Sequence, residues 1–208
     1  MTDAYHLDSN VGNIVGTRRQ RALITGTYEL PFGRDRAWGR HASPAVNALI
    51  GGWDVSTVTL VQTGPFLTPT ISPAYDAANV NALGRGTIVR PDLIGSPTLA
   101  HPTPDAWWNI NAFAPAPLDA GRVGNARVGS LEGPGTCAVA AGFAKTFGLG
   151  AHARGRLELT VTNLFNRVNY APPATDIGTP ATFGKTTSAQ TAENAGHRTG
   201  QLAFRVAF

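Results

Sequence analysis

Charged side chains are scarce in this chain. Asp, Glu, Lys and Arg make up 14% of its 208 residues, against about 25% in soluble domains, and lysine is nearly absent beside arginine. Long apolar runs are also lacking, because none approaches the roughly 20 residues that a membrane-spanning helix needs. The composition therefore argues against a soluble globular domain and excludes a helical membrane protein.

Cysteine is limited to Cys137, which excludes an intrachain disulfide and a cysteine-based zinc site. We interpret Cys137 as a small wall residue rather than a nucleophile. The histidines are far apart and form no His-x-His or His-x-x-x-His pair, and Ser130 lacks the Gly-x-Ser-x-Gly turn of a hydrolase. We therefore expect no metal site, no cofactor and no enzymatic activity.

The net charge of +4 comes from scattered arginines, with local groups only at 18–21 and 34–40. Neither group interleaves with aromatic residues as a nucleic-acid stacking surface would, so we expect no nucleic-acid partner. Residues 1–8 have neither a basic region nor an apolar core, and we expect no secretory signal in this chain.

Five stretches alternate apolar and polar side chains with the period of two that is typical of β-strands. In the last of them, Leu202, Phe204, Val206 and Phe208 lie on one side, with small or polar residues between them. Such an aromatic final strand is typical of transmembrane β-barrels of bacterial outer membranes, although a soluble sandwich could end in the same way. The predicted strands lie near residues 21–30, 53–62, 137–147, 156–166 and 200–208.

The connections between these strands alternate in length. If the chain ends on the periplasmic side, the long stretches 1–18, 64–135 and 167–198 all become extracellular, and the shorter stretches 31–52 and 148–153 become periplasmic. Outer-membrane barrels sort their loops in this way, whereas a soluble sandwich has no reason to do so. We therefore predict that the last strand runs toward the periplasm.

The predicted fold class is all-β: an antiparallel, curved, partial transmembrane β-barrel sheet of about five strands with long extracellular loops. Because five strands cannot close a barrel, the sheet should have two free edges. Arg156 and Glu158 alternate with leucines, and that charged side should face the lumen or solvent. Lys145 interrupts an apolar side, and its stem should reach toward an interface. A short helical pattern covers residues 45–50.

From about residue 19 onward, the chain resembles the C-terminal barrel segments of Oar-like TonB-dependent receptors of outer membranes. The order and spacing of the motifs carry the resemblance. They are Tyr28-Glu-Leu-Pro-Phe-Gly33, Gly51-Gly-Trp53, Gln62-Thr-Gly-Pro65, Trp108-Asn-Ile-Asn-Ala-Phe113, Gly124-Asn-Ala-Arg127 with Gly133-Pro-Gly135, Asn163-Leu-Phe-Asn166 with Asn169-Tyr170, Phe183-Gly184 and the aromatic terminal strand.

The resemblance implies a 22-stranded barrel with an N-terminal plug on which TonB acts. This chain would supply only a C-terminal part of that barrel, without the plug, and would not be competent for transport alone. The implied partners are outer-membrane lipid, the barrel-assembly machinery, and the remaining strands and plug of the receptor. In the family, the assembly machinery recognises the terminal strand. The resemblance therefore implies that the assembly signal of this chain consists of Leu202, Phe204, Val206 and Phe208.

Asp105, Trp107 and Trp108 form the sharpest candidate for a binding site. Two tryptophans beside a carboxylate could form a sugar-stacking platform, or the tryptophans could pin a long outer loop to the barrel rim. The first reading leads to an alternative function, a secreted all-β carbohydrate-binding or adhesin-like module. The identity of a ligand stays open at this point.

Overall fold

The computed structural model describes residues 7–80, 88–150 and 152–208, and parts of the predicted loops at 1–6 and 81–87 lie outside this range. The chain forms two compact units, which we call the sheet unit and the loop unit. The sheet unit comprises Arg21–Val61, Cys137–Asn169 and Thr191–Phe208. The loop unit comprises Met1–Gln20, Gln62–Thr136 and Tyr170–Gln190.

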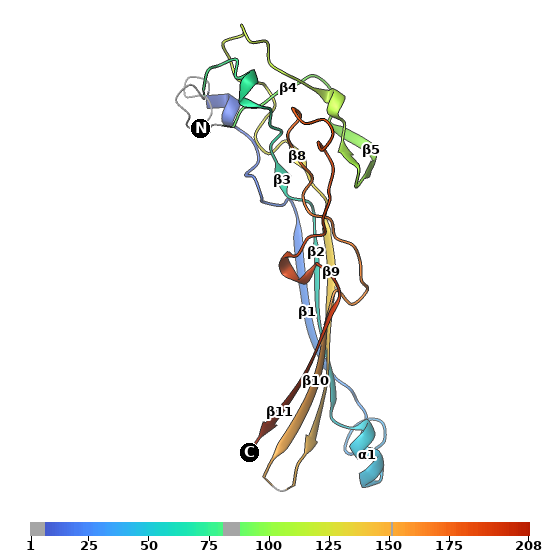
Figure 1. Cartoon of the computed structure of the whole chain (residues 1–208). Coiled ribbons are helices and arrows are strands. Elements are labelled where there is room, and N and C mark those ends of the chain that lie inside the picture. The colour runs from blue at the N-terminus through green and yellow to red at the C-terminus, as the bar shows by residue number, and fades with distance from the viewer. Residues whose placement is uncertain (1–6, 81–87, 151) are drawn as a thin grey trace. The chain divides into compact units, whose positions relative to one another are not determined.

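The sheet unit is built on one five-stranded antiparallel sheet in the order β1-β2-β9-β10-β11 (Figure 1). The strands are β1 (Arg21–Glu29), β2 (Trp53–Gln62), β9 (Thr136–Gly148), β10 (Arg154–Thr162) and β11 (Thr199–Ala207). All five predicted strands are present. Among the described residues the order is open, with β1 and β11 outermost, and the predicted curvature of the sheet stays a prediction.

The fourth predicted strand was placed too far along the chain, because β10 ends at Thr162 rather than at Asn166. Strand β10 ends at Thr162 because the next residue, Asn163, forms a turn. Its backbone adopts the left-handed conformation, with φ of 44°, and its side chain exchanges hydrogen bonds with the main chain of Arg167 at 2.8 and 3.0 Å. Asparagine tolerates this conformation better than most residues, and the resulting turn leaves Phe165 exposed outside the sheet.

The strand register sorts the side chains onto two faces. Leu157 lies opposite Phe204 and Arg156 opposite Arg205, and directly opposed residues of antiparallel strands share a face. The apolar face carries Ile24, Tyr28, Trp53, Val55, Val61, Phe143, Phe147, Leu157, Leu159, Val161, Leu202, Phe204 and Val206. The polar face carries Arg21, Thr25, Thr27, Glu29, Asp54, Ser56, Thr146, Arg156, Glu158, Thr160, Thr162, Thr199, Gln201 and Arg205.

One short helix, α1 (Pro44–Ile50), lies in the connection from β1 to β2. The Ser43 hydroxyl accepts a hydrogen bond from the Val46 N–H at 3.3 Å, and Pro44 fits the first helical turn, where no main-chain donor is needed. The helical pattern predicted at 45–50 is thereby confirmed. Figure 1 shows α1 at the same end of the sheet as the turn between β9 and β10.

The described residues of the loop unit form three short two-stranded pairings in place of a large sheet. They join β3 (Phe66–Leu67) to β8 (Leu131–Glu132), β4 (Asp92–Leu93) to β7 (Phe113–Ala114), and β5 (Thr98–Thr103) to β6 (Ala106–Trp108). The 3-10 turns of this unit are Leu7–Asn10, Pro73–Tyr75 and Ile110–Ala112, and a fourth turn, Ala192–Asn194, lies in the sheet unit.

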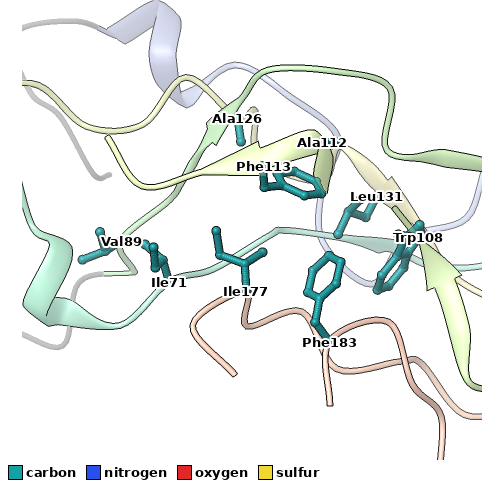
Figure 2. Close-up of a cluster of buried hydrophobic side chains, with 9 residues drawn as sticks. All are labelled: Ile71, Val89, Trp108, Ala112, Phe113, Ala126, Leu131, Ile177 and Phe183. Atoms are coloured by element: carbon teal, nitrogen blue, oxygen red, sulfur yellow. The ribbon is translucent and has the colours of Figure 1, made fainter. Parts of the chain in front are cut away.

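A hydrophobic core nevertheless orders the loop unit, as Figure 2 shows. The Phe183 ring lies 5.9 Å from that of Trp108 and 5.6 Å from that of Phe113, centroid to centroid, and Leu131 is fully buried beside them. These residues come from segments distant in sequence. The aperiodic pattern of the stretch correctly predicted that its described residues form no long strand, but it gave no indication of this core.

Candidate functional site

The apolar face of the sheet is unusually exposed. Leu202 and Phe204 of β11 expose 69% and 57% of their surface, and their neighbours Leu157 and Leu159 of β10 are also exposed. No layer of the sheet unit covers them among the described residues. A contiguous apolar surface of this kind marks contact with lipid or with another protein.

The polar face is held by an ion-pair network that ties β2 to β10. The Arg156 guanidinium donates to both carboxylate oxygens of Asp54, at 2.7 and 2.9 Å, and also lies 3.5 Å from the Glu158 carboxylate. Thr146 of β9, the strand between them, accepts from the same guanidinium at 3.3 Å. Both members of the predicted charged pair thus lie away from the apolar face.

Lys145 is the one charged residue on the apolar side of β9, and its ammonium group is satisfied at the end of the sheet. It donates to the carbonyl oxygens of Leu49 and Gly51 at 3.1 and 2.7 Å, and it lies 4.8 Å from the ring centroid of Trp53. The Trp53 indole N–H donates to the same Leu49 carbonyl at 2.9 Å. The lysine stem therefore reaches past the apolar surface to the C-terminal carbonyls of α1.

The terminal strand β11 is the outermost strand beside β10, and all of its residues are exposed. Leu202, Phe204 and Val206 project from its apolar side, and Phe208 follows the strand fully exposed. Its second edge presents main-chain groups that can pair with a further strand. This arrangement fits the predicted assembly signal geometrically, while the signal itself stays a prediction.

The three residues of the predicted sugar platform are not brought together as a site. Trp108 is buried in the loop-unit core, Trp107 is half-buried, and Asp105 lies exposed in the tight turn between β5 and β6. Both indole N–H groups donate to the main-chain carbonyl of Glu132, at 3.3 Å for Trp107 and 3.1 Å for Trp108. Trp108 therefore packs in the core of the loop unit and is 6% exposed.

A cavity of about 300 Å³ does lie beside the tryptophans, but with other partners. Its walls include Arg19, Phe66, Trp107, Trp108, Leu131 and Glu132, and Asp105 does not line it. The Arg19 guanidinium pairs with the Glu132 carboxylate at 3.4 Å and lies over the Phe66 ring. Arg19 and Glu132 were not predicted because long-range pairings bring their segments together, with Phe66 opposite Glu132 and Arg18 opposite Pro65.

A second ion pair of the loop unit joins Arg122 to Asp92, and neither residue lines this cavity. The Arg122 guanidinium donates to both oxygens of Asp92 at 2.7 and 2.8 Å, and the Asn125 N–H donates to the same carboxylate at 2.9 Å. These hydrogen bonds, of which that from Arg122 is the strongest, hold the pKa of Asp92 below its ordinary value. The carboxylate therefore stays ionised although it is buried.

In the part of the chain that the structure describes, no group of three or more His, Cys, Asp or Glu side chains is placed to hold a metal ion. The helices of residues 7–80, 88–150 and 152–208 are all too short or too polar to span a membrane.

Comparison with known proteins gives one match. A family model described as an outer membrane beta barrel domain matches residues 1–201. No curated protein and no solved structure matches the chain. The family match covers nearly the whole chain and agrees with the open antiparallel sheet and its exposed apolar face. The chain therefore belongs to the outer membrane beta barrel domain family, and its location is the outer membrane.

Proposed function

We propose that the chain forms a C-terminal part of the barrel wall of an Oar-like TonB-dependent receptor, with a transport role rather than an enzymatic one. The observation that carries the proposal is the two-faced sheet, with aliphatic and aromatic side chains on one face and an ion-pair network on the other. Its strands contain 9 to 13 residues, and about 9–11 tilted residues cross a bilayer. The apolar face then contacts lipid, and the polar face lines the lumen.

Further strands are needed to complete such a barrel. The outer strands β1 and β11 each have one edge that is not paired within the described sheet, and unpaired edges in a membrane leave polar main-chain groups without partners. In the proposal, the remaining strands of the receptor satisfy both edges. Transport then depends on a plug inside the barrel on which TonB acts, so the described strands alone bind ligand weakly and transport nothing.

An antibody raised against residues 154–208 tests the proposal in cells of the native host. It should detect a heat-modifiable protein in the outer-membrane fraction, and an immobilised periplasmic domain of TonB should retain that protein after detergent extraction. A protein that reaches the outer membrane but is not retained by TonB would overturn the transporter assignment and leave the family assignment intact.

The terminal strand supports a second part of the proposal, the recognition by the barrel-assembly machinery. Leu202, Phe204, Val206 and Phe208 would be read as alternate side chains of an exposed edge, with main-chain hydrogen bonds supplying affinity. In the complete receptor, Phe208→Asp should lower the amount of folded, heat-modifiable barrel. Ala207→Ser, on the other side of the strand, should not. Equal assembly of both variants would exclude the signal.

The alternative function, a secreted all-β carbohydrate-binding or adhesin-like module, fits the molecule less well. It leaves the apolar face without a partner, and its proposed platform is less well supported because Trp108 is buried and Asp105 does not line the cavity. The cavity beside Trp107 remains a place where a receptor of this kind could contact a ligand. Binding of sugars by the culture-medium fraction, with no signal in the outer membrane, would favour the module.

A further inference from the structure

The connection from β1 to β2, residues 31–52, exposes an apolar helix. No residue of α1 is buried, and Val46 and Leu49 expose 46% and 74% of their surface. They are three residues apart and so lie on the same side of the helix. Asn47, the one polar residue of α1, accepts a hydrogen bond from the Arg34 N–H at 2.6 Å and so faces the connection itself. The outer side of α1 has no polar group to interact with water.

The helix ends at the boundary of the apolar face. The Leu49 carbonyl, in the last turn of α1, accepts hydrogen bonds from both Trp53 and Lys145, two residues on the apolar side of β2 and β9. Tryptophan and lysine at the end of transmembrane strands are typical of the interface between acyl chains and headgroups. The C-terminal end of α1 therefore contacts two residues of the apolar face, Trp53 and Lys145.

The same connection is basic. It contains Arg34, Arg36 and Arg40 against one acidic residue, Asp35, and Arg36 is paired with Glu29 at 2.8 Å. Arg40 is exposed. A cavity of about 380 Å³ lies between the connection and the end of β9, and Arg34, Arg36, Phe32 and Phe147 are among its lining residues. A planar guanidinium is well suited to bind a phosphate group.

We propose that the connection at residues 31–52 is a docking surface for anionic phospholipid. Val46 and Leu49 enter the boundary of the acyl chains, Arg34 takes a headgroup phosphate at the mouth of the cavity, and Arg40 adds attraction to the charged leaflet. The partner is the phospholipid leaflet at this end of the sheet. The inference rests on the membrane location of the sheet and is independent of TonB, so the two proposals can fail separately.

A nitroxide spin label at position 49 tests the insertion of α1. The complete receptor, with Cys137→Ser and Leu49→Cys, is labelled and reconstituted into vesicles of phosphatidylglycerol and phosphatidylcholine in equal parts. The label should collide more often with oxygen than with a water-soluble nickel chelate, as a label at Leu202 on the lipid-facing strand should. A label at Thr27 on the polar face is the aqueous control. Nickel accessibility at position 49 equal to that at Thr27 would overturn the proposal.

Retention of phospholipid tests the role of the arginines. Native mass spectrometry of the receptor, extracted in mild detergent and supplied with phosphatidylglycerol or phosphatidylcholine, should show preferential retention of phosphatidylglycerol. The double variant Arg34→Gln and Arg40→Gln should lose most of that preference, whereas Arg127→Gln, an exposed arginine of the loop unit, should keep it. Equal retention by the double variant and the parent would contradict phosphate binding by this surface.

Discussion

The ion pair between Asp54 and Arg156 should make a measurable contribution to the stability of the barrel wall. Charge-assisted hydrogen bonds contribute about 1.5–3 kcal/mol when they are protected from water. The Arg156 side chain is 36% exposed and that of Asp54 18%, so solvent screening reduces this contribution. We expect Asp54→Asn to lower the free energy of unfolding by about 1–2 kcal/mol.

The register of β10 and β11 also brings two like charges together. Arg156 lies directly opposite Arg205 of β11, and like charges in that position repel each other. The Asp54 carboxylate offsets this repulsion, so in Asp54→Asn the two arginines should destabilise the sheet. Arg205→Gln introduced into the Asp54→Asn variant should therefore recover about 0.5 kcal/mol. In the receptor with Asp54 intact, Arg205→Gln should raise the free energy of unfolding by less than this.

Urea unfolding of the complete receptor in phospholipid vesicles, followed by the heat-modifiable band, measures these differences. A double-mutant cycle with Asp54→Asn and Arg156→Gln isolates the pair from other effects. The coupling should weaken at high salt, because a partly exposed pair is screened. A coupling near zero at low salt would refute the assignment of both residues to one face.

Three further predictions concern local packing and charge. Gly155→Ala should destabilise the sheet by about 1 kcal/mol, because an added Cβ would meet the Phe147 ring at 2.8 Å, whereas Gly200→Ala has open space and should not. Asp92, whose pKa is lowered in the folded chain, stabilises the loop unit above its unfolded pKa of about 3.9, and this contribution is lost as the pH falls through the lowered pKa. Near-ultraviolet circular dichroism should show that Asp92→Asn removes this acid dependence, and an unchanged acid transition would contradict it. Phe183→Ala should cost about 3 kcal/mol through the cavity it leaves in the core and should abolish the aromatic signal of the loop unit; a retained signal would show that the core does not depend on this ring.

The sheet was predictable because its signals are local in sequence. Alternation with a period of two placed all five strands, and the charges of Arg156 and Glu158 identified the polar face. The end of β10 was missed because the left-handed turn at Asn163 depends on hydrogen bonds to Arg167, which no periodicity reveals. Side-chain alternation therefore predicts where a strand lies, but it does not predict a strand end that is set by a single turn.

The loop unit was not predictable in the same way. Its core joins Trp108 and Phe113 to Phe183, and its cavity joins Trp107 to Glu132, through contacts between distant segments. Adjacency in sequence suggested a site made of Asp105 and the tryptophans. The structure exposes Asp105 in the β5–β6 turn and buries Trp108, and a ligand site there stays a prediction. Single-sequence patterns carry no information on such long-range pairings.

Cysteine labelling along β10 shows directly which face of the sheet contacts lipid and which contacts water. Cysteine is introduced singly at positions 157, 158, 159 and 160 of the Cys137→Ser receptor in native outer membranes, and each variant is treated with a membrane-impermeant maleimide small enough to enter the barrel. We expect labelling to alternate, with Glu158→Cys and Thr160→Cys labelled from the aqueous lumen and Leu157→Cys and Leu159→Cys protected by lipid. Uniform labelling, or labelling of the leucine positions alone, would contradict the central claim that this sheet is a wall of an outer-membrane barrel.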